Sequence, residues 1–322
     1  MIRQTMVGPV AVLMLLAGAA ALPALAGEDA KAQAPAAPQA AAPRAAATQE
    51  VRLPGLASTE WLAANVGKEG VKVLDLRDQR EYNTGHVPGA LRLAPDSLRG
   101  TIGGVPSMLL PPRMLAGHFS LLGFRPTDTI VLVAGEKMHD ATLAAVACER
   151  LGHLRYAVLD GGFLKWSAEK RPADTALPRV EPSEYPVPAE PPDFIITLPQ
   201  VVEAMKKRSA TIIDARPPEY YSGKKSEEAR GGHIPGAASC FVGDDLVRRD
   251  GYRVFRPVEE LAARYATVIP SKDAPVIDHC RTGHEASQTF FVLRRLLGYE
   301  NVKYFDGGWT EWSPRADLPA EK

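Results

Sequence analysis

One cysteine is placed where the chain could activate a thiol. Residues 280–285 read Cys-Arg-Thr-Gly-His-Glu and separate an apolar run from a helical pattern that starts at Ala286. A cysteine on a tight turn before a helix lies among backbone N–H groups, at the positive end of the helix dipole. Such a site binds anions and can lower a thiol pKa from about 8.5 to roughly 3.5–7.5. Gly283 suits the bend because glycine adopts positive φ. The sequence therefore predicts Cys280 as a nucleophile in an anion-binding loop, the Cys loop (280–285).

The segments around the Cys loop predict a parallel sheet. Three strand-like runs alternate with three helix-like patterns: in chain order, Ile196–Lys207 (helix), Thr211–Ala215 (strand), Pro257–Ala266 (helix), Ala274–His279 (strand), Ala286–Leu297 (helix) and Asn301–Phe305 (strand). This alternation is typical of an α/β fold whose parallel sheet carries helices on both faces. Parallel sheets bind ligands beyond the carboxyl ends of their strands, which is where Cys280 falls.

Three motifs occur twice, in the same order. They are Asp-x-Arg at Asp75 and Asp214, Gly-His-x-Pro-Gly-Ala around His86 and His233, and Asp-Gly-Gly-aromatic at Asp160 and Asp306. The separations are 139, 147 and 146 residues. Near-constant offsets indicate a duplicated unit. The shorter first offset leaves about eight extra residues in the second copy, which we assign to a polar surface loop at Ser222–Arg230 (the insertion).

Composition divides the chain into five parts. Residues 27–50 hold eleven alanines and three prolines, and residues 172–193 hold seven prolines, so both segments lack the apolar content of a core. We expect a signal peptide at 1–26, a flexible Ala/Pro spacer at 27–50, domain 1 at 51–171, a Pro-rich linker at 172–193 and domain 2 at 194–322.

The N-terminal pattern predicts export. Arg3 precedes an apolar run from Val10 to Leu22, and Ala24-Leu25-Ala26 supplies a small-x-small cleavage site. The alternative, an uncleaved anchor, needs roughly 20 apolar residues, and this run is shorter. We expect a periplasmic or secreted protein without stable membrane insertion after signal cleavage.

Charge and cysteine content exclude several classes of protein. The 322 residues carry 38 basic and 38 acidic side chains, so no polybasic surface points to nucleic acid or anionic lipid as a partner. Three cysteines are too few for a disulfide scaffold. The 45% hydrophobic content is that of a soluble globular protein.

The paired motifs and the single six-residue Cys loop together resemble the tandem-domain rhodaneses, the thiosulfate and 3-mercaptopyruvate sulfurtransferases. The resemblance covers about residues 51–318. It implies two rhodanese-like α/β domains, the first catalytically silent and the second active. It further implies that sulfur passes from a small anionic donor such as thiosulfate to Cys280, forming a persulfide, and then to a thiophilic acceptor such as cyanide. No metal and no organic cofactor is implied.

The silent domain can be located in the sequence. Six residues before Ala286 stands Cys280, whereas six residues before the matching Ala141 stands Gly135. Residues 135–140 (the domain 1 loop) therefore lack a thiol and cannot supply the sulfur nucleophile. We expect domain 1 to wall the cleft and to pack against domain 2.

The candidate substrate-binding residues are Arg216, Arg281, Thr282, Gly283, His284 and Glu285. The resemblance implies that Arg216 faces the substrate anion, and an ion pair with Asp214 or Glu219 is the alternative. Arg281 places positive charge beside the nucleophile, although a solvated side chain is also open.

Glu285 departs from the rhodanese pattern, which usually has Thr, Ser or Arg at this position. A carboxylate about 6 Å from the sulfur opposes a thiolate by roughly 3 kcal/mol at an effective dielectric constant near 20. Glu285 therefore points outward, pairs with Arg281 or His284, or belongs to a site whose donor is not thiosulfate.

Other residues are assigned structural roles. Those duplicated in the silent copy are read as structural: His86, His233, Asp75, Asp214, Asp160 and Asp306. Cys148 lies in an apolar helical pattern and is assigned to the core. For Cys240 a disulfide with Cys280 stays open, because an exported protein meets oxidising conditions.

Three other functions are alternatives to a thiosulfate sulfurtransferase. A phosphatase of the related Cys-loop type needs a longer loop and an arginine where this chain has Ala286. A 3-mercaptopyruvate sulfurtransferase usually has a small neutral residue at the position of Arg281. A persulfide carrier for an exported partner is favoured only by Glu285. The physiological donor and acceptor and the oligomeric state are not indicated by the sequence.

Overall fold

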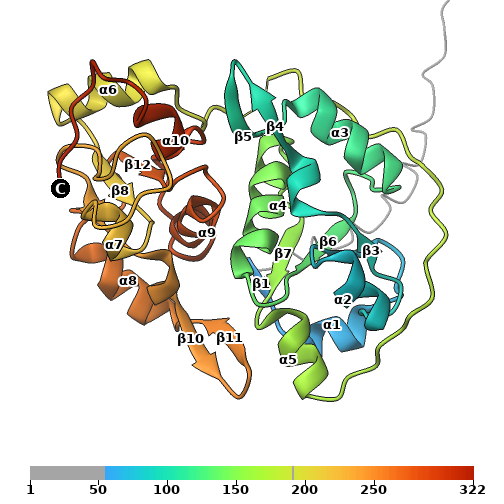
Figure 1. The fold of residues 1–322 in the computed structure, drawn as a ribbon. Helices are drawn as coiled ribbons and strands as arrows, with labels where there is room; N and C mark the ends of the chain where they lie inside the picture. Colours follow the sequence, from blue (N-terminus) through green and yellow to red (C-terminus); the bar gives the residue numbers. More distant parts are fainter. Residues whose placement is uncertain (1–54, 191) are drawn as a thin grey trace, which may run out of the picture. The chain divides into compact units, whose positions relative to one another are not determined.

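Five short runs of domain 1 form one parallel sheet in the computed structural model, which describes residues 55–190 and 192–322 (Figure 1). The sheet order is β1-β7-β6-β2-β3. Its strands are β1 (Leu56–Ala57), β2 (Val71–Asp75), β3 (Leu91–Arg92), β6 (Thr129–Val133) and β7 (Tyr156–Leu159). Its helices are α1 (Thr59–Asn65), α2 (Gln79–Thr84), α3 (Pro112–Leu121), α4 (Met138–Arg150) and α5 (Gly162–Ala168). The predicted signal peptide and spacer lie outside the described residues.

Alternate residues of the domain 1 strands point to opposite faces, as the pleat requires. Leu74 and Leu132 join one buried cluster with side chains of α3 and α4, whereas Val73 and Val131 join another with side chains of α1, α2 and α5. Both faces are therefore buried at the centre of the sheet, which explains why β6 and β7 consist almost entirely of apolar residues.

Domain 2 repeats this plan with four parallel strands in the order β13-β12-β8-β9. Its strands are β8 (Thr211–Asp214), β9 (Ala238–Ser239), β12 (Val276–His279) and β13 (Val302–Tyr304). Its helices are α6 (Leu198–Lys207), α7 (Pro218–Tyr221), α8 (Val258–Ala266), α9 (Ala286–Phe291) and α10 (Gly308–Trp312). The predicted α/β class and parallel sheets are confirmed. The helix predicted to reach Leu297 starts as α9 and continues as a π-helix at Val292–Leu296.

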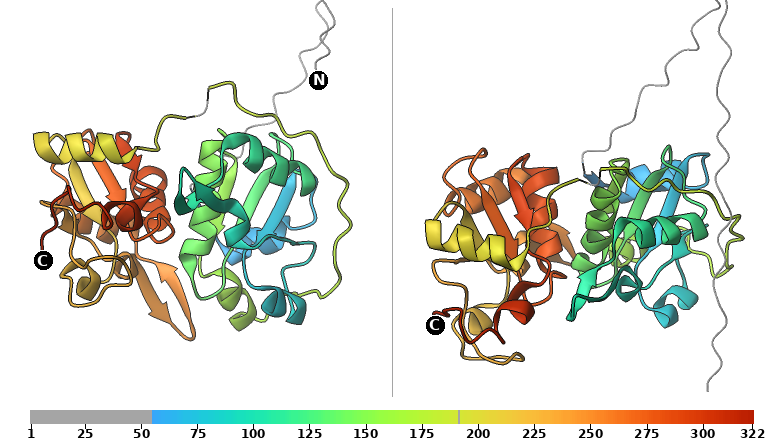
Figure 2. Two further views of the ribbon diagram at one scale, coloured as in Figure 1. Left: turned by 45° about the horizontal axis from the view of Figure 1, so that its top comes forward. Right: turned by 90° about the horizontal axis from the view of Figure 1, so that it is seen from above.

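Helices cover both faces of the second sheet as well (Figure 2). Ile213 and Val276 pack with α8 and α9, whereas Ile212 and Ile277 pack with α6 and α10. Each domain also carries an antiparallel hairpin outside its sheet. These are β4 (Arg99–Ile102) with β5 (Val105–Leu109), and β10 (Leu246–Arg249) with β11 (Tyr252–Phe255).

The described residues of both domains belong to one compact unit. Helices α4 and α9, which occupy matching positions in the two copies, pack against each other (Figure 1). Between them the hydroxyls of Thr142 and Ser287, themselves matching residues, hydrogen-bond at 2.8 Å. Domain 1 thus packs on domain 2, and it does so through equivalent helices.

The two hairpins exchange equivalent contacts. The backbone N–H of Leu109 in β5 donates to the Asp306 carboxylate at 2.6 Å, and the N–H of Phe255 in β11 donates to the Asp160 carboxylate at 2.9 Å. Leu109 and Phe255 are 146 residues apart, as are the two aspartates. The duplicated domains therefore meet in an approximately two-fold manner, as in an isologous dimer.

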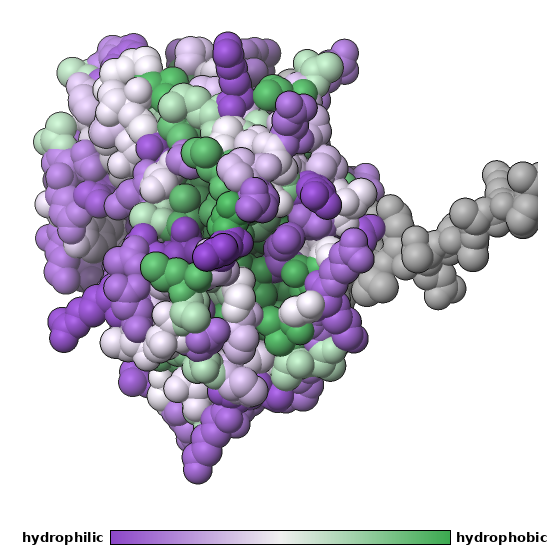
Figure 3. Space-filling model, turned by 90° about the vertical axis from the view of Figure 1, so that its right-hand side faces the viewer, coloured by the Kyte–Doolittle hydropathy of each residue, from purple (hydrophilic) through white to green (hydrophobic). Residues whose placement is uncertain are grey.

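The Pro-rich linker is hydrogen-bonded to domain 1. The described linker residues form no helix or strand, yet Ser183 and Tyr185 hydrogen-bond to Ser120 of α3. Among the described residues, no helix combines the length and apolar character required to cross a bilayer. The face drawn in Figure 3 shows hydrophilic side chains around several hydrophobic patches.

Candidate active site

Cys280 lines a pocket of about 430 Å³ and lies directly after β12 and ahead of α9. Only 1% of the residue is exposed. Backbone N–H groups of Thr282, Glu285 and Ala286 interact with the sulfur and favour its negatively charged form. The loop thus has the anion-binding geometry that the sequence predicts.

The protonation of the thiol differs from the prediction. Burial raises the pKa of Cys280 to about 12, and the Glu285 charge adds to this effect. The N–H groups lower the pKa by less than burial raises it. The prediction of a depressed thiol pKa is therefore wrong for this structure, because the sulfur lies deeper than a loop at a helix start suggests.

Glu285 lines the same pocket as Cys280. Neither ion pair considered for it forms, because Arg281 pairs with Glu227 and His284 with Asp140. Burial raises the pKa of the Glu285 carboxyl, while His284 and Arg281 act in the opposite direction. Two groups that both resist ionisation therefore share one pocket.

Arg281 points to the insertion. Its guanidinium lies 2.7 Å from Glu227 and 3.8 Å from Glu228, and nearly half of its side chain is exposed. Both glutamates belong to the predicted surface loop at Ser222–Arg230, which has no helix or strand and is largely exposed. The insertion therefore touches the Cys loop, which its polar composition did not indicate.

The bend of the Cys loop depends on Gly283. Its φ of 78° is positive, as predicted. A Cβ atom at this position would clash with the Asp306 carboxylate and lie 2.8 Å from the Tyr304 hydroxyl. That hydroxyl donates to the Gly283 carbonyl at 2.6 Å, and Arg99 of domain 1 donates to the Thr282 carbonyl at 2.6 Å. Both domains thus fix the loop backbone.

The end of the Asp-Gly-Gly-aromatic motif and the residue after it hydrogen-bond to the backbone of the Cys loop. The backbone N–H groups of Trp309 and Thr310 donate to the carbonyls of Cys280 and Arg281, each at 2.9 Å. A Cβ atom on Gly308 would lie 2.5 Å from the Cys280 carbonyl oxygen, so only glycine allows this approach. The repeat identified the motif as structural, and the structure gives the reason.

Family comparison agrees with this architecture. The model of the rhodanese-like domain matches residues 58–169 and again 197–315. The chain belongs to the rhodanese-like family. The predicted resemblance is confirmed, and each match contains one copy of the three repeated motifs.

Several relatives and one solved structure show what this chain is similar to. The sulfur carrier protein TtuD of Thermus thermophilus is 31% identical over 279 residues, covering 83% of this chain and 96% of the relative. The thiosulfate sulfurtransferase of Corynebacterium glutamicum is 29% identical over 280 residues, covering 83% and 90%. The crystal structure of SseA from Escherichia coli, described as a 3-mercaptopyruvate sulfotransferase, aligns with a TM-score of 0.70 at 26% identity. It covers 79% of this chain and 98% of SseA.

Within this rhodanese-like site, Arg216 is engaged by the protein. Its guanidinium binds the Asp214 carboxylate at 2.6 and 2.9 Å, donates to the Gly232 carbonyl at 2.7 Å and stacks over Trp309 at 4.8 Å. It lines the pocket but is 3% exposed. Nε and Nη2 form the Asp214 ion pair given as the alternative, and because Arg216 also lines the pocket, the substrate contact implied by the resemblance stays a prediction.

Domain 1 lines the pocket with residues that the sequence did not single out. They are Asp96, Arg99, Ser107 and His139, joined on the side of domain 2 by Pro217, Tyr220 and Glu227. The expected role of domain 1 as a wall is confirmed in this respect. The available sequence signal was the matching position of His139 and His284, which are 145 residues apart like Ala141 and Ala286.

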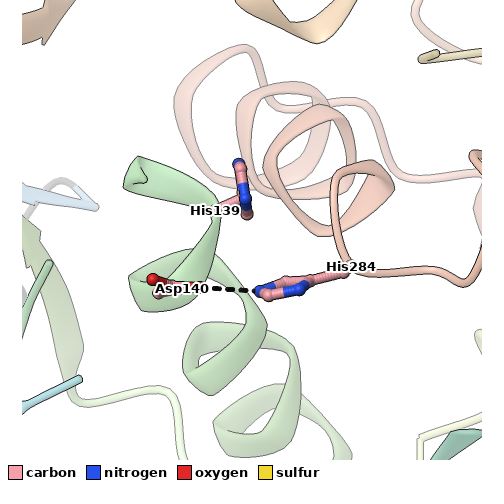
Figure 4. Close-up of side chains that lie close together, drawn as sticks. All are labelled: His139, Asp140 and His284. Atoms are coloured by element: carbon pink, nitrogen blue, oxygen red, sulfur yellow. Dashed lines mark ion pairs between the residues drawn. The ribbon is translucent and has the colours of Figure 1, made fainter. Parts of the chain in front are cut away.

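His284 leaves the Cys loop toward domain 1. Its Nε2 lies 2.9 Å from an Asp140 carboxylate oxygen, and its ring meets that of His139 edge-on at 4.7 Å (Figure 4). Burial, assisted by the His284 charge, lowers the pKa of His139 to about 4. The His139 ring is therefore neutral near pH 7.

The remaining cysteines are separate from this site. Cys148 is fully buried in α4, as predicted. Strand β8 lies between β12 and β9, with His279 and Ser239 both opposite Asp214 in its register. Cys280 and Cys240 follow these partners, so they stand two strand spacings apart, about 10 Å. A disulfide needs Cα atoms within about 7 Å, so the pairing of Cys240 with Cys280 is wrong for this structure.

Proposed function

We propose that this protein is a sulfurtransferase that carries sulfane sulfur on Cys280. The observation that carries the proposal is the thiol itself. It lines a pocket large enough for a small donor, and three backbone N–H groups interact with its sulfur. Such donors stabilise an anion at the position where a persulfide would form.

The reaction needs no external oxidant. The Cys280 thiolate attacks the outer sulfur of thiosulfate, a new S–S bond forms, and sulfite leaves with the electron pair of the old S–S bond. Cyanide then attacks the outer sulfur of the persulfide and leaves as thiocyanate, which returns the thiolate. The thiol proton is released to solvent before the first attack.

The names of the relatives support sulfur transfer, and the donor we propose is thiosulfate. Arg281 stands beside the nucleophile and is partly exposed at the pocket, which suits an anionic donor. 3-Mercaptopyruvate is the alternative donor, suggested by the likeness to SseA.

A persulfide carrier is the second candidate, and a specific observation favours it. Burial and Glu285 both favour the neutral thiol, which slows attack on a free donor. A partner that delivers sulfur directly would avoid this cost by supplying its own activating groups. The relative from Thermus thermophilus is named a sulfur carrier.

The first test is steady-state formation of thiocyanate from thiosulfate and cyanide. We expect the turnover rate of Cys280→Ser to be at least about 1000-fold lower than that of the parent protein, because removal of the nucleophile has effects of this size in other enzymes. Cys240→Ser is the matched control, because this buried thiol lies outside the pocket, and it should keep its activity. Equal activity of Cys280→Ser and the parent protein would overturn the role of Cys280.

The second test separates the enzyme from the carrier. Intact mass measurement after incubation with thiosulfate, or with a persulfide donor, detects one added sulfur atom on Cys280. An enzyme forms this adduct from thiosulfate and turns over with cyanide. A carrier forms it stoichiometrically from a persulfide donor and does not turn over thiosulfate.

We further propose that residues 1–26 direct export and are removed. The support is the order of basic, apolar and small residues in this segment. Expression of the full chain in a bacterial host should yield a periplasmic form whose N-terminus lies near Gly27. An uncleaved cytoplasmic product would contradict the proposal.

A further inference from the structure

Three possible metal ligands meet where the Cys loop touches domain 1. His139 and Asp140 belong to the first turn of α4, and His284 belongs to the Cys loop. One ligand atom from each, two imidazole nitrogens and a carboxylate oxygen, lie within 4.8 Å of one another. Figure 4 shows the His284 ring directed toward Asp140, with His139 on the same side of α4.

The protein itself leaves this cluster incompletely bonded. Nε2 of His284 is buried and makes no hydrogen bond, although the Asp140 oxygen is only 2.9 Å away. Among the described residues, the ring nitrogens of His139 have no hydrogen-bond partner, and the ring's aromatic contact is the edge of His284. A buried polar atom without a hydrogen bond is costly, so a cation bound to Nε2 of His284 would satisfy an atom that the protein does not.

We propose that His139, Asp140 and His284 bind one divalent transition-metal ion, for which Zn²⁺ is the test ion. Two imidazole nitrogens and one carboxylate oxygen are a known three-residue ligand set for zinc, with a fourth position left for solvent or another ligand. Magnesium and calcium prefer all-oxygen sites, so they should bind poorly here.

The spacing fits after small side-chain rotations. Ligand atoms around a tetrahedral zinc ion with bonds of about 2.1 Å stand roughly 3.4 Å apart. The His284–Asp140 pair is already closer than this. His139 and His284 come from separate elements, so rotation of either ring can shorten their separation without moving a helix.

The site would join the two domains beside the sulfur pocket. Two ligands come from domain 1 and one from the Cys loop, and both histidines line the pocket that holds Cys280. A bound ion would tie the Cys loop to α4 and so limit movement of the loop during sulfur transfer. This inference does not depend on which sulfur donor the protein uses.

Zinc binding to the full chain tests the proposal by calorimetry and by competition with a chromophoric chelator. We expect one Zn²⁺ per chain, and a dissociation constant raised at least about tenfold by His139→Ala, Asp140→Asn or His284→Ala. His118→Ala on α3 is the matched control, because this histidine is outside the cluster. Cys280→Ser should also retain the zinc site, because the thiol is not one of the three ligands.

The absorption spectrum of bound Co²⁺ distinguishes the proposed site from metal binding by the Cys280 thiolate. Co²⁺ bound to nitrogen and oxygen lacks the thiolate charge-transfer band that Co²⁺ bound to Cys280 would show. Loss of binding in Cys280→Ser, or unchanged binding in His139→Ala, would overturn the proposal. If His284→Ala fails to fold, His139→Ala and Asp140→Asn decide the question, because both lie outside the Cys loop.

Discussion

Domains 1 and 2 place the same buried ion pair beside their loops, yet only one loop carries a thiol. In domain 1 Arg77 binds Asp75 at 2.6 Å and donates to the Gly85 carbonyl at 2.8 Å. The matching distances around Arg216 in domain 2 are 2.6 and 2.7 Å. Each guanidinium also lies over the aromatic residue of its Asp-Gly-Gly motif. The duplicated motifs therefore build the scaffold and are independent of the chemistry.

Two differences between the domains bear directly on the pocket. Gly135 stands where domain 2 has Cys280, and the insertion at Ser222–Arg230 has no counterpart in domain 1. The domain 1 loop instead supplies His139 and Asp140 to the other domain. Duplication has thus produced one loop with a thiol and one loop without a thiol that contacts it, on a single plan.

The largest difference in stability should come from glycines at the two loops. Gly283→Ala forces a positive φ on alanine and a clash with Asp306, and we expect it to lower the free energy of unfolding by about 3 kcal/mol. Gly135→Ala places its Cβ atom 3.2 Å from Cγ of Arg77, at a backbone position without positive φ, and should cost less, about 1 kcal/mol. Chemical denaturation of both variants measures the contrast. Equal losses would show that the loops are under the same constraint.

The two interdomain aspartates should differ in pH dependence. Burial raises the pKa of Asp306 to about 6, and the pKa of Asp160 is also raised, with the carboxyl less deeply buried. A folded pKa above the unfolded value means that this contribution to stability falls as pH rises from about 4 to 6. Asp306→Asn should remove roughly 2–3 kcal/mol of that pH dependence, and Asp160→Asn less. Denaturation at pH 4, 5, 6 and 7 checks the order, and an unchanged profile in Asp306→Asn would contradict it.

Glu285 places a carboxyl group in the pocket of Cys280. Glu285→Thr removes the charge that helps to raise the pKa of Cys280, so more thiolate forms near pH 7. We expect thiosulfate turnover to rise about tenfold, which corresponds to one pKa unit. The rate should also reach its plateau at lower pH than in the parent protein. A slower variant with an unshifted pH–rate profile would instead assign Glu285 a direct part in the reaction.

The smallest effect should come from the insertion. Glu227→Gln releases Arg281 from its ion pair and should lower the KM for thiosulfate about two- to threefold at low salt. Stability should change little, because exposed ion pairs contribute about 0–1 kcal/mol. Glu203→Gln in α6, which breaks the exposed pair with Lys207, is the matched control. A similar change in KM in both variants would show that the insertion has no part in substrate binding.

The sequence by itself determined the duplicated α/β plan, the parallel sheets and the position of Cys280 after a strand. These features follow from local rules: β-branched runs form strands, Gly283 permits a left-handed turn, and a helix starts at Ala286. Near-constant offsets between motifs then revealed the two copies. Each of these signals lies within a few neighbouring residues or in a simple repeat.

Tertiary structure alone decided the electrostatics and the contacts between copies. The thiol pKa depends on how deeply the fold buries Cys280, which residue types around the loop do not specify. The partners of Arg281, His284 and Asp306 lie 54, 144 and 197 residues away in the sequence. Desolvation and Coulomb interactions depend on distance in space, so they could be assigned only once the two domains were packed together.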